Sequence, residues 1–78
     1  MNKITTEIFE RAYQSYLCGA DTYTYKFYSK TNIMIKKYLD AIKFLEQNEL
    51  IIIKFLSEDK AKISLTENGI EYGNNISI

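Results

Sequence analysis

Hydrophobic positions near the start of the chain recur at helical spacing. Apolar residues follow one another at intervals of one, three and four, the period of a helix with one buried face. The members of this stripe are Ile8, Phe9, Ala12, Tyr13, Tyr16 and Leu17. Thr5 or Thr6 can cap the helix, and Gly19 can end it in the left-handed conformation. The pattern therefore predicts a first helix that ends before Gly19.

Residues 22–28 allow two interpretations. Their alternation and their Thr, Tyr and Phe content favour a strand when they are read in isolation. Asp21 before them is a good helix cap, and they run directly into a strong helical pattern, which suits a helix better than a strand without a partner. We expect a short second helix here. Asn32, which readily adopts the left-handed conformation, would then form a tight turn into the next helix.

The pattern from Met34 to about Gln47 is clearly helical. Tyr38, Ala41, Ile42 and Leu45 lie on one side of this third helix, and Lys36, Lys37, Asp40 and Lys43 lie on another. This segment is therefore the most strongly indicated helix of the chain.

The remaining pattern predicts a hairpin and a last helical turn. Residues 50–56 are β-branched and apolar, and residues 61–65 alternate between apolar and polar, with a polar tip at residues 57–60 between them. Thr66 can cap a short helix through Tyr72, before Gly73 and a frayed tail. The sequence thus predicts one α+β domain over residues 1–78, with a three-helix core, a two-stranded β-hairpin and a short C-terminal helix.

Composition favours association with a second copy. The chain has 78 residues, of which 46% are hydrophobic and 14% aromatic. A core of this size stabilises a domain by only a few kcal/mol, so a homodimer would be more stable. The seven Tyr and four Phe suit either the core or a subunit interface, and both remain open.

Targeting signals and cysteine usage indicate a cytoplasmic protein. Cys18 is the only cysteine, which excludes an intramolecular disulfide, and we expect it to pack as a small hydrophobe. The longest apolar run, residues 50–53, is far shorter than the roughly 20 residues that cross a bilayer. The first residues have no signal-peptide core. We therefore expect a soluble protein without membrane contact.

Positive charge is concentrated in one part of a neutral chain. The net charge is zero, yet residues 26–43 have a local sum of +4. This segment contains Lys26, Lys30, Lys36, Lys37 and Lys43 against Asp40. Such a dipolar surface suits a polyanion, although an ordinary solvated helix face has the same composition.

Four short strings resemble those of winged helix-turn-helix proteins, in the same order and at similar spacing. Lys30-Thr-Asn-Ile33 resembles the turn between the two helices, and Ala41-Ile-Lys-Phe-Leu45 resembles the end of the recognition helix. Leu45-Glu-Gln-Asn-Glu-Leu-Ile51 is similar to the entry into the first wing strand. Ser64-Leu-Thr-Glu-Asn-Gly69 is similar to the return from the wing to a helix. The resemblance covers about residues 5–73.

The resemblance implies a winged helix-turn-helix fold and a dimer that binds double-stranded DNA through the third helix. Glu49 departs from the family pattern, where Gly is usual, and Met34 stands where Ser or Thr caps the recognition helix. Within the superfamily the chain is similar to TubR-like adaptors, the centromere-binding proteins of plasmid and phage partition systems, whose partner is a tubulin-like GTPase. A small transcriptional repressor shares the same features. The two roles both remain open.

A helix in the major groove would use its N-terminal end and outward face. Lys36 and Lys37 are the candidate base contacts, Lys43 is a candidate phosphate contact, and the turn residues Lys30 and Thr31 can touch the backbone. The candidate contacts of the wing are Lys60 and Lys62, weakened by Glu58 and Asp59 at its tip. Met34 and Ile35 are candidates for a dimer contact, and their burial against the second helix is the alternative.

An enzyme is not indicated. The chain has no histidine and three scattered glycines, so the usual nucleophile pairs, zinc ligand sets and phosphate loops are missing. Glu58 and Asp59 are expected at a solvated hairpin tip with ordinary pKa values. We expect no catalysis, metal or cofactor. The alternative from another class is a winged-helix module that binds a protein instead of DNA.

Overall fold

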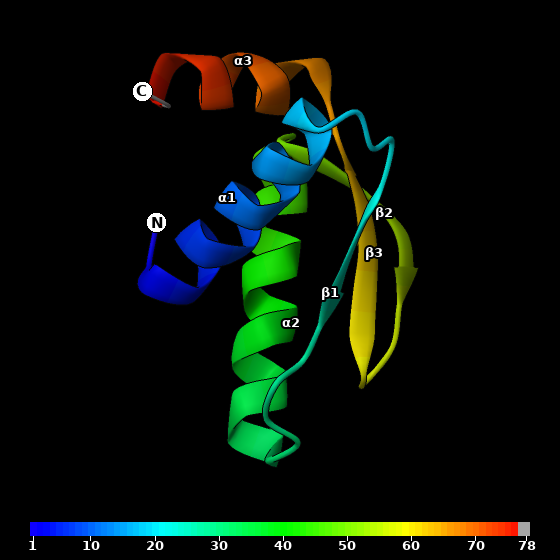
Figure 1. Ribbon diagram of the computed structural model, residues 1–78. Helices are drawn as coiled ribbons and strands as arrows, with labels where there is room; N and C mark the ends of the chain where they lie inside the picture. Colours follow the sequence, from blue (N-terminus) through cyan, green and yellow to red (C-terminus); the bar gives the residue numbers. More distant parts are fainter. Residues whose placement is uncertain (77–78) are drawn as a thin grey trace.

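The computed structural model describes residues 1–76 as an α+β fold with three helices and a three-stranded antiparallel sheet (Figure 1). The elements are α1 (Lys3–Leu17), β1 (Tyr23–Lys26), α2 (Asn32–Gln47), β2 (Ile51–Leu56), β3 (Lys60–Leu65) and α3 (Glu67–Ile76). Helices α1 and α2 lie on one side of the sheet, and α3 crosses its upper end (Figure 1). Within the described residues, no helix is long and apolar enough to span a membrane. This arrangement is compatible with a winged-helix-like layout.

Strand β3 is the centre of the sheet, with β1 and β2 as its edges. Tyr25 lies opposite Ala61 on one side, and Ile53 lies opposite Ile63 on the other. A β-bulge at Lys54 shifts the alternation of β2, so that Phe55 lies opposite Lys62. The predicted hairpin is confirmed, and it forms two strands of a sheet with three.

The second helix predicted for residues 22–28 is wrong. Tyr23–Lys26 form the edge strand β1, which pairs with β3, and the amide of Phe27 donates to the carbonyl of Asp59 at 2.9 Å. The partner strand lies far along the chain, so the local pattern indicated a strand without showing what it pairs with. The tight helix-turn-helix at Asn32 is therefore also wrong, because Asn32 is the first residue of α2.

Both long helices begin at caps that differ from the expected ones. Asn2 caps α1 by accepting a hydrogen bond from the Thr5 amide at 2.8 Å, whereas Thr5 itself is buried. Thr31 caps α2, because its hydroxyl accepts from the Met34 amide at 3.3 Å. In the family pattern a Ser or Thr caps the recognition helix at position 34. In this chain the capping residue is Thr31, three residues earlier. The expected left-handed end of the first helix at Gly19 is confirmed, with φ of 96°.

Helix α3 is longer than its pattern indicated. Thr66 caps it as predicted, accepting a hydrogen bond from the Gly69 amide at 2.9 Å, and the helix continues past Tyr72 to Ile76. Gly69 and Gly73 let it pack closely, because a Cβ at these positions would collide with the Leu50 carbonyl and the Tyr13 ring. Residues 74–76 are therefore helical and not frayed. The rest of the predicted tail lies outside the described residues.

The core lies between the sheet and the two long helices. Its aromatic part joins β1 to α2, where the rings of Phe27 and Tyr38 stack with centroids 4.9 Å apart and Tyr25 meets Tyr38 edge-on at 5.8 Å. The buried hydrophobic residues are Ile8, Phe9, Ala12, Tyr13, Tyr25, Phe27, Tyr38, Ala41, Ile42, Leu45, Leu50, Ile51, Ala61 and Ile63. Cys18 is exposed after α1, so its predicted burial is wrong.

Candidate nucleic-acid interface

One side of α2 is exposed along the whole helix. Its inward side buries Tyr38, Ala41, Ile42 and Leu45, as the sequence predicted. The outward residues around Asp40, which we call the α2 face, are Ile33, Lys36, Lys37, Asp40, Lys43, Phe44 and Gln47, and Asn32 and Glu46 are exposed beside them. Three lysines against one aspartate give this face a positive charge, which the neighbouring Glu46 reduces. It is the surface on which the predicted contacts Lys36, Lys37 and Lys43 come together.

An ion pair within α2 partly neutralises this charge. Lys36 Nζ lies 3.0 Å from Asp40 Oδ2, one helical turn away. Lys37 and Lys43 make no ion pair with any described residue. Because an exposed pair of this kind stabilises a helix by only about 0.3–0.5 kcal/mol, Lys36 can exchange Asp40 for another anion at little cost.

The loop before α2 is tied to the tip of the hairpin. Lys30 Nζ lies 2.8 Å from Asp59 Oδ1, and the hydrogen bond from Lys30 holds the pKa of Asp59 below its usual range. The expectation of an ordinary pKa for this exposed carboxylate is therefore wrong. Thr31 uses its hydroxyl to cap α2. Both predicted backbone contacts thus already have partners within the chain.

The two predicted wing lysines lie on a different surface from the α2 lysines. Lys60 and Lys62 are exposed and alternate along β3 with the fully buried Ala61 and Ile63, so they project from the side of the sheet that faces away from the helices. Lys26 on β1 lies directly opposite Lys60. Sequence reasoning grouped Lys26 with the α2 lysines, and only the pairing of β1 with β3 places it on the sheet.

The predicted dimer contacts are only partly accessible. Met34 is half-buried against the core, and half-buried Ile35 lines a groove between α2 and the hairpin tip together with Leu39 and Glu58. The most exposed apolar side chains nearby in the sequence are Ile33, at 72% exposure, and Tyr28, at 65%. Ile33 was missed because the helix was expected to start after it, and Tyr28 because residues 22–28 were expected to form a helix.

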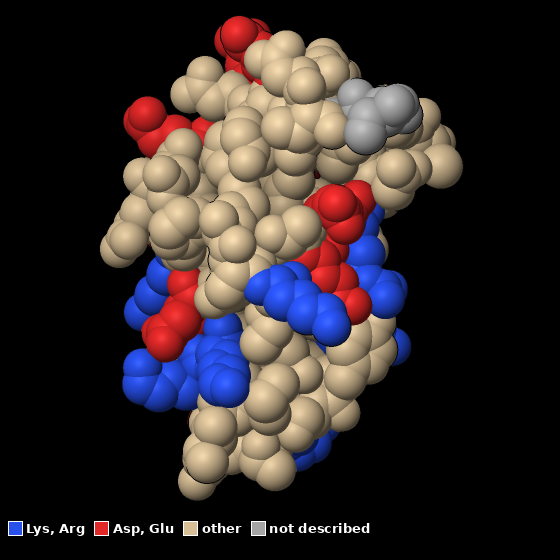
Figure 2. Space-filling view, turned by 90° about the vertical axis from the view of Figure 1, so that its left-hand side faces the viewer, with Lys and Arg blue, Asp and Glu red and all other residues tan. Residues whose placement is uncertain are grey.

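Charged side chains are unevenly distributed over the surface. On the side shown in Figure 2, Lys and Arg gather in the lower half, where they alternate with a few Asp and Glu, whereas the upper part is mostly uncharged with some acidic side chains. The lower half corresponds to the N-terminal half of α2 in Figure 1. On this face, basic side chains are therefore concentrated toward one end of the molecule.

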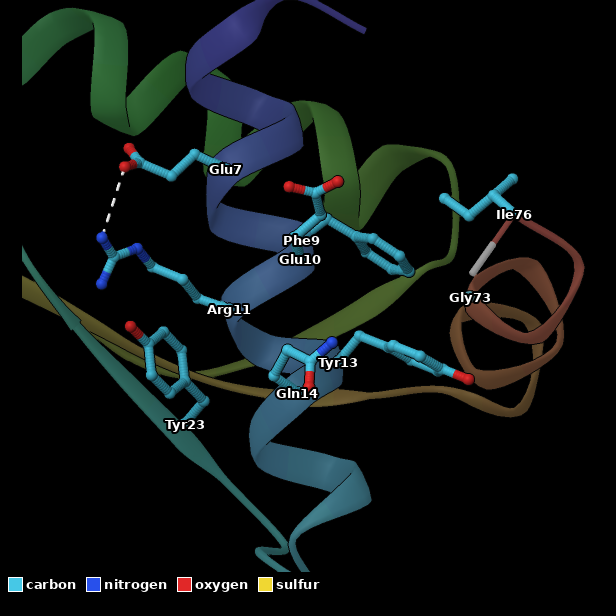
Figure 3. A pocket seen from close by; sticks show the side chains of 9 residues that line it. All are labelled: Glu7, Phe9, Glu10, Arg11, Tyr13, Gln14, Tyr23, Gly73 and Ile76. Carbon is cyan, nitrogen blue, oxygen red and sulfur yellow. Dashed lines mark hydrogen bonds and ion pairs between the residues drawn. The ribbon is translucent and has the colours of Figure 1, made fainter. Parts of the chain in front are cut away.

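A shallow hollow along α1 does not form a competing site. Its labelled side chains lie on both sides of the helix, with Glu7 and Arg11 toward β1 and with Phe9 and Tyr13 toward α3 (Figure 3). Glu7 and Arg11 pair with each other at 3.5 Å. Because α1 separates the two groups, their polar atoms do not converge on a common point where a ligand could sit.

Comparison with known proteins does not indicate which function these surfaces serve. No protein-family model, curated protein or solved structure matches the chain. Function therefore has to be inferred from the two positively charged surfaces of the chain itself, the α2 face and the outer side of the sheet.

Proposed function

We propose that this chain is a small winged-helix-like protein that binds double-stranded DNA through its α2 face. The exposure of this basic face along the whole of α2 carries the proposal. An α-helix with its side chains is about 10–12 Å across, and the major groove is about 12 Å wide, so such a helix can lie in the groove. The positive charge would favour its approach to the phosphates.

The positions of the lysines suggest a division of roles. Lys36 and Lys37 lie near the N-terminal end of α2, which is the end that reaches base edges in helices of this kind. Lys43 lies about 10 Å further along the helix axis, where it would meet a phosphate. Ile33 lies on the same face and would contact a thymine methyl group. Lysine reads guanine less rigidly than arginine does, so discrimination between bases would be modest.

The proposal includes a homodimer. A chain of this size has a small core, and two copies related by twofold symmetry would present two α2 faces to one duplex. The exposed Tyr28, in the segment between β1 and α2, supplies apolar surface for such a contact. Transcriptional repression and partition through a tubulin-like GTPase both start from such a DNA-bound dimer. They differ in what the bound dimer recruits.

Fluorescence anisotropy with a labelled duplex taken from upstream of the gene tests the proposal. The Lys37→Ala/Lys43→Ala variant should bind at least tenfold more weakly at low salt. Its log–log salt slope should be smaller by about 1, because the lost phosphate contact of Lys43 removes about 0.9. Lys54→Ala/Lys62→Ala removes the same charge from the sheet and serves as the matched control.

Two results would overturn the proposal. The first is a folded wild-type protein that does not bind duplex DNA at low salt, which would favour a protein-interaction module. The second is an equal loss of affinity in the α2 variant and its control, since the loss would then come from the lower net charge and not from the position of the lysines. A scrambled duplex in the same titration measures how much of the binding depends on sequence.

A further inference from the structure

The side of the sheet that faces away from the helices carries a set of exposed side chains from all three strands. We call it the outer sheet face. Its members are Thr24, Lys26, Ile52, Phe55, Lys60 and Lys62. Within the described residues, no helix lies over it (Figure 1). Residues that alternate with its members point into the core, so this face is a consequence of the same pattern that builds the sheet.

The charge of this face has one sign. The three strands contain Lys26, Lys54, Lys60 and Lys62 and no acidic residue. None of these four lysines makes an ion pair with a described residue. Lys26 and Lys60 lie directly opposite each other on neighbouring strands, an arrangement that destabilises a sheet. An anion placed between them would remove this repulsion.

The face also has an exposed aromatic ring beside its lysines. The bulge at Lys54 turns Phe55 outward, where it lies opposite Lys62 and is 49% exposed. Lys60 Nζ lies 5.9 Å from the centroid of the Phe55 ring. Ile52 on the same strand is equally exposed. A phosphate-binding surface alone would not require an exposed ring and an exposed aliphatic side chain.

We propose that the outer sheet face binds single-stranded nucleic acid, with Lys26, Lys60 and Lys62 at the phosphates and a base stacked on Phe55. Exposed aromatic rings beside basic residues on an open surface are the means by which proteins bind unpaired strands. Bases in a duplex are already stacked on each other and cannot use the ring. An acidic peptide would pair with the lysines but would leave Phe55 in water. The inference is independent of duplex binding, because it uses a different surface.

Binding to a labelled oligothymidine of about 15 nucleotides, a length within the range of single-strand sites, tests this inference. Phe55→Ala should weaken binding by about tenfold, in line with the loss of one stacked base. Phe55→Tyr should restore it, whereas Phe55→Leu, which keeps apolar bulk, should not. The matched control is Tyr16→Ala, because Tyr16 on α1 is 39% exposed and lies outside both the outer sheet face and the α2 face. Far-UV circular dichroism confirms that each variant is folded.

Other results of these binding measurements either contradict the inference or support it. Unchanged binding by Phe55→Ala would overturn it, as would the same loss in Tyr16→Ala or a folded wild-type protein that does not bind the oligonucleotide at low salt. Undiminished oligothymidine binding by Lys37→Ala/Lys43→Ala would support it. Duplex affinities of the same variants, measured in parallel, separate its failure from the failure of duplex binding by α2.

Discussion

Lys30 and Asp59 join the loop before α2 to the turn of the hairpin through a 2.8 Å ion pair. The same turn accepts a hydrogen bond from the Phe27 amide, so the loop is held at two points. Both charged side chains are exposed, so their pair adds little to stability. The pair links the loop to the hairpin turn and gives a partner within the chain to a lysine that the sequence had assigned to DNA.

Removing Lys30 should raise the pKa of Asp59. The hydrogen bond and charge of Lys30 hold this pKa below its usual value, so Lys30→Ala should return it toward the ordinary range of an aspartate. A depressed carboxylate pKa stabilises the fold above the unfolded pKa of about 4, and this contribution is lost as pH falls through the folded pKa. NMR titration of the Asp59 carboxyl measures the shift directly. An unchanged pKa in the variant would mean that the pair does not form in solution.

Glu49→Gly should stabilise the protein by about 1 kcal/mol. Glu49 has φ of 59°, a left-handed conformation that costs a residue with a Cβ about 1–2 kcal/mol and glycine very little. The greater freedom of glycine in the unfolded chain offsets part of the gain. Urea denaturation measures the change. Glu49→Ala is the control, because it removes the charge and keeps the strain, and an equal gain from both variants would assign the effect to charge.

Gly69→Ala should destabilise the fold by about 2 kcal/mol or more. The new Cβ would collide with the backbone carbonyl of Leu50, and a backbone atom at the packed α3 contact cannot move aside cheaply. Alanine's better helix propensity recovers only about 1 kcal/mol of this loss. The neighbouring Asn68→Ala should change stability by about 0.5 kcal/mol or less, because Asn68 is exposed. Thermal unfolding of both variants compares them, and similar midpoints would show that α3 does not pack as described.

Stability should fall at alkaline pH in a way that depends on Tyr25. Burial, with a smaller contribution from nearby Glu7, raises the pKa of this hydroxyl above its ordinary value. The folded state then retains a proton that the unfolded state releases above about pH 10, so stability decreases as pH rises past that value. The loss from one group is at most about 1.4 kcal/mol per pH unit. Urea unfolding across this range should show a shallower decline in Tyr25→Phe, and parallel curves would contradict the assignment.

Local periodicity was sufficient for the elements whose partners are nearby. It located α2 through its buried stripe, and it located the hairpin because β2 and β3 are joined by a short turn. It failed for β1, because the alternation of Tyr23, Tyr25 and Phe27 becomes a strand only when β3 supplies the hydrogen bonds. The start of α2 was missed for a related reason, since a cap is defined by the hydroxyl of Thr31 rather than by hydrophobic spacing.

The candidate site was predictable as a set of lysines but not as a surface. The sequence pattern placed Lys36, Lys37 and Lys43 together on one helix face. It could not separate them from Lys26, whose position depends on the register of β1 against β3. Pairing across the sheet therefore divides one basic segment of the sequence between two sides of the molecule.

The most direct test of DNA binding by α2 is an NMR titration of ¹⁵N-labelled protein with the upstream duplex. The largest amide shifts should come from the loop before α2 and from the α2 face, around Ile33, Lys37 and Lys43, and they should diminish as salt is added. Shifts concentrated on Lys26, Lys60 and Lys62, or none at low salt in a folded protein, would contradict the proposal that α2 contacts the duplex.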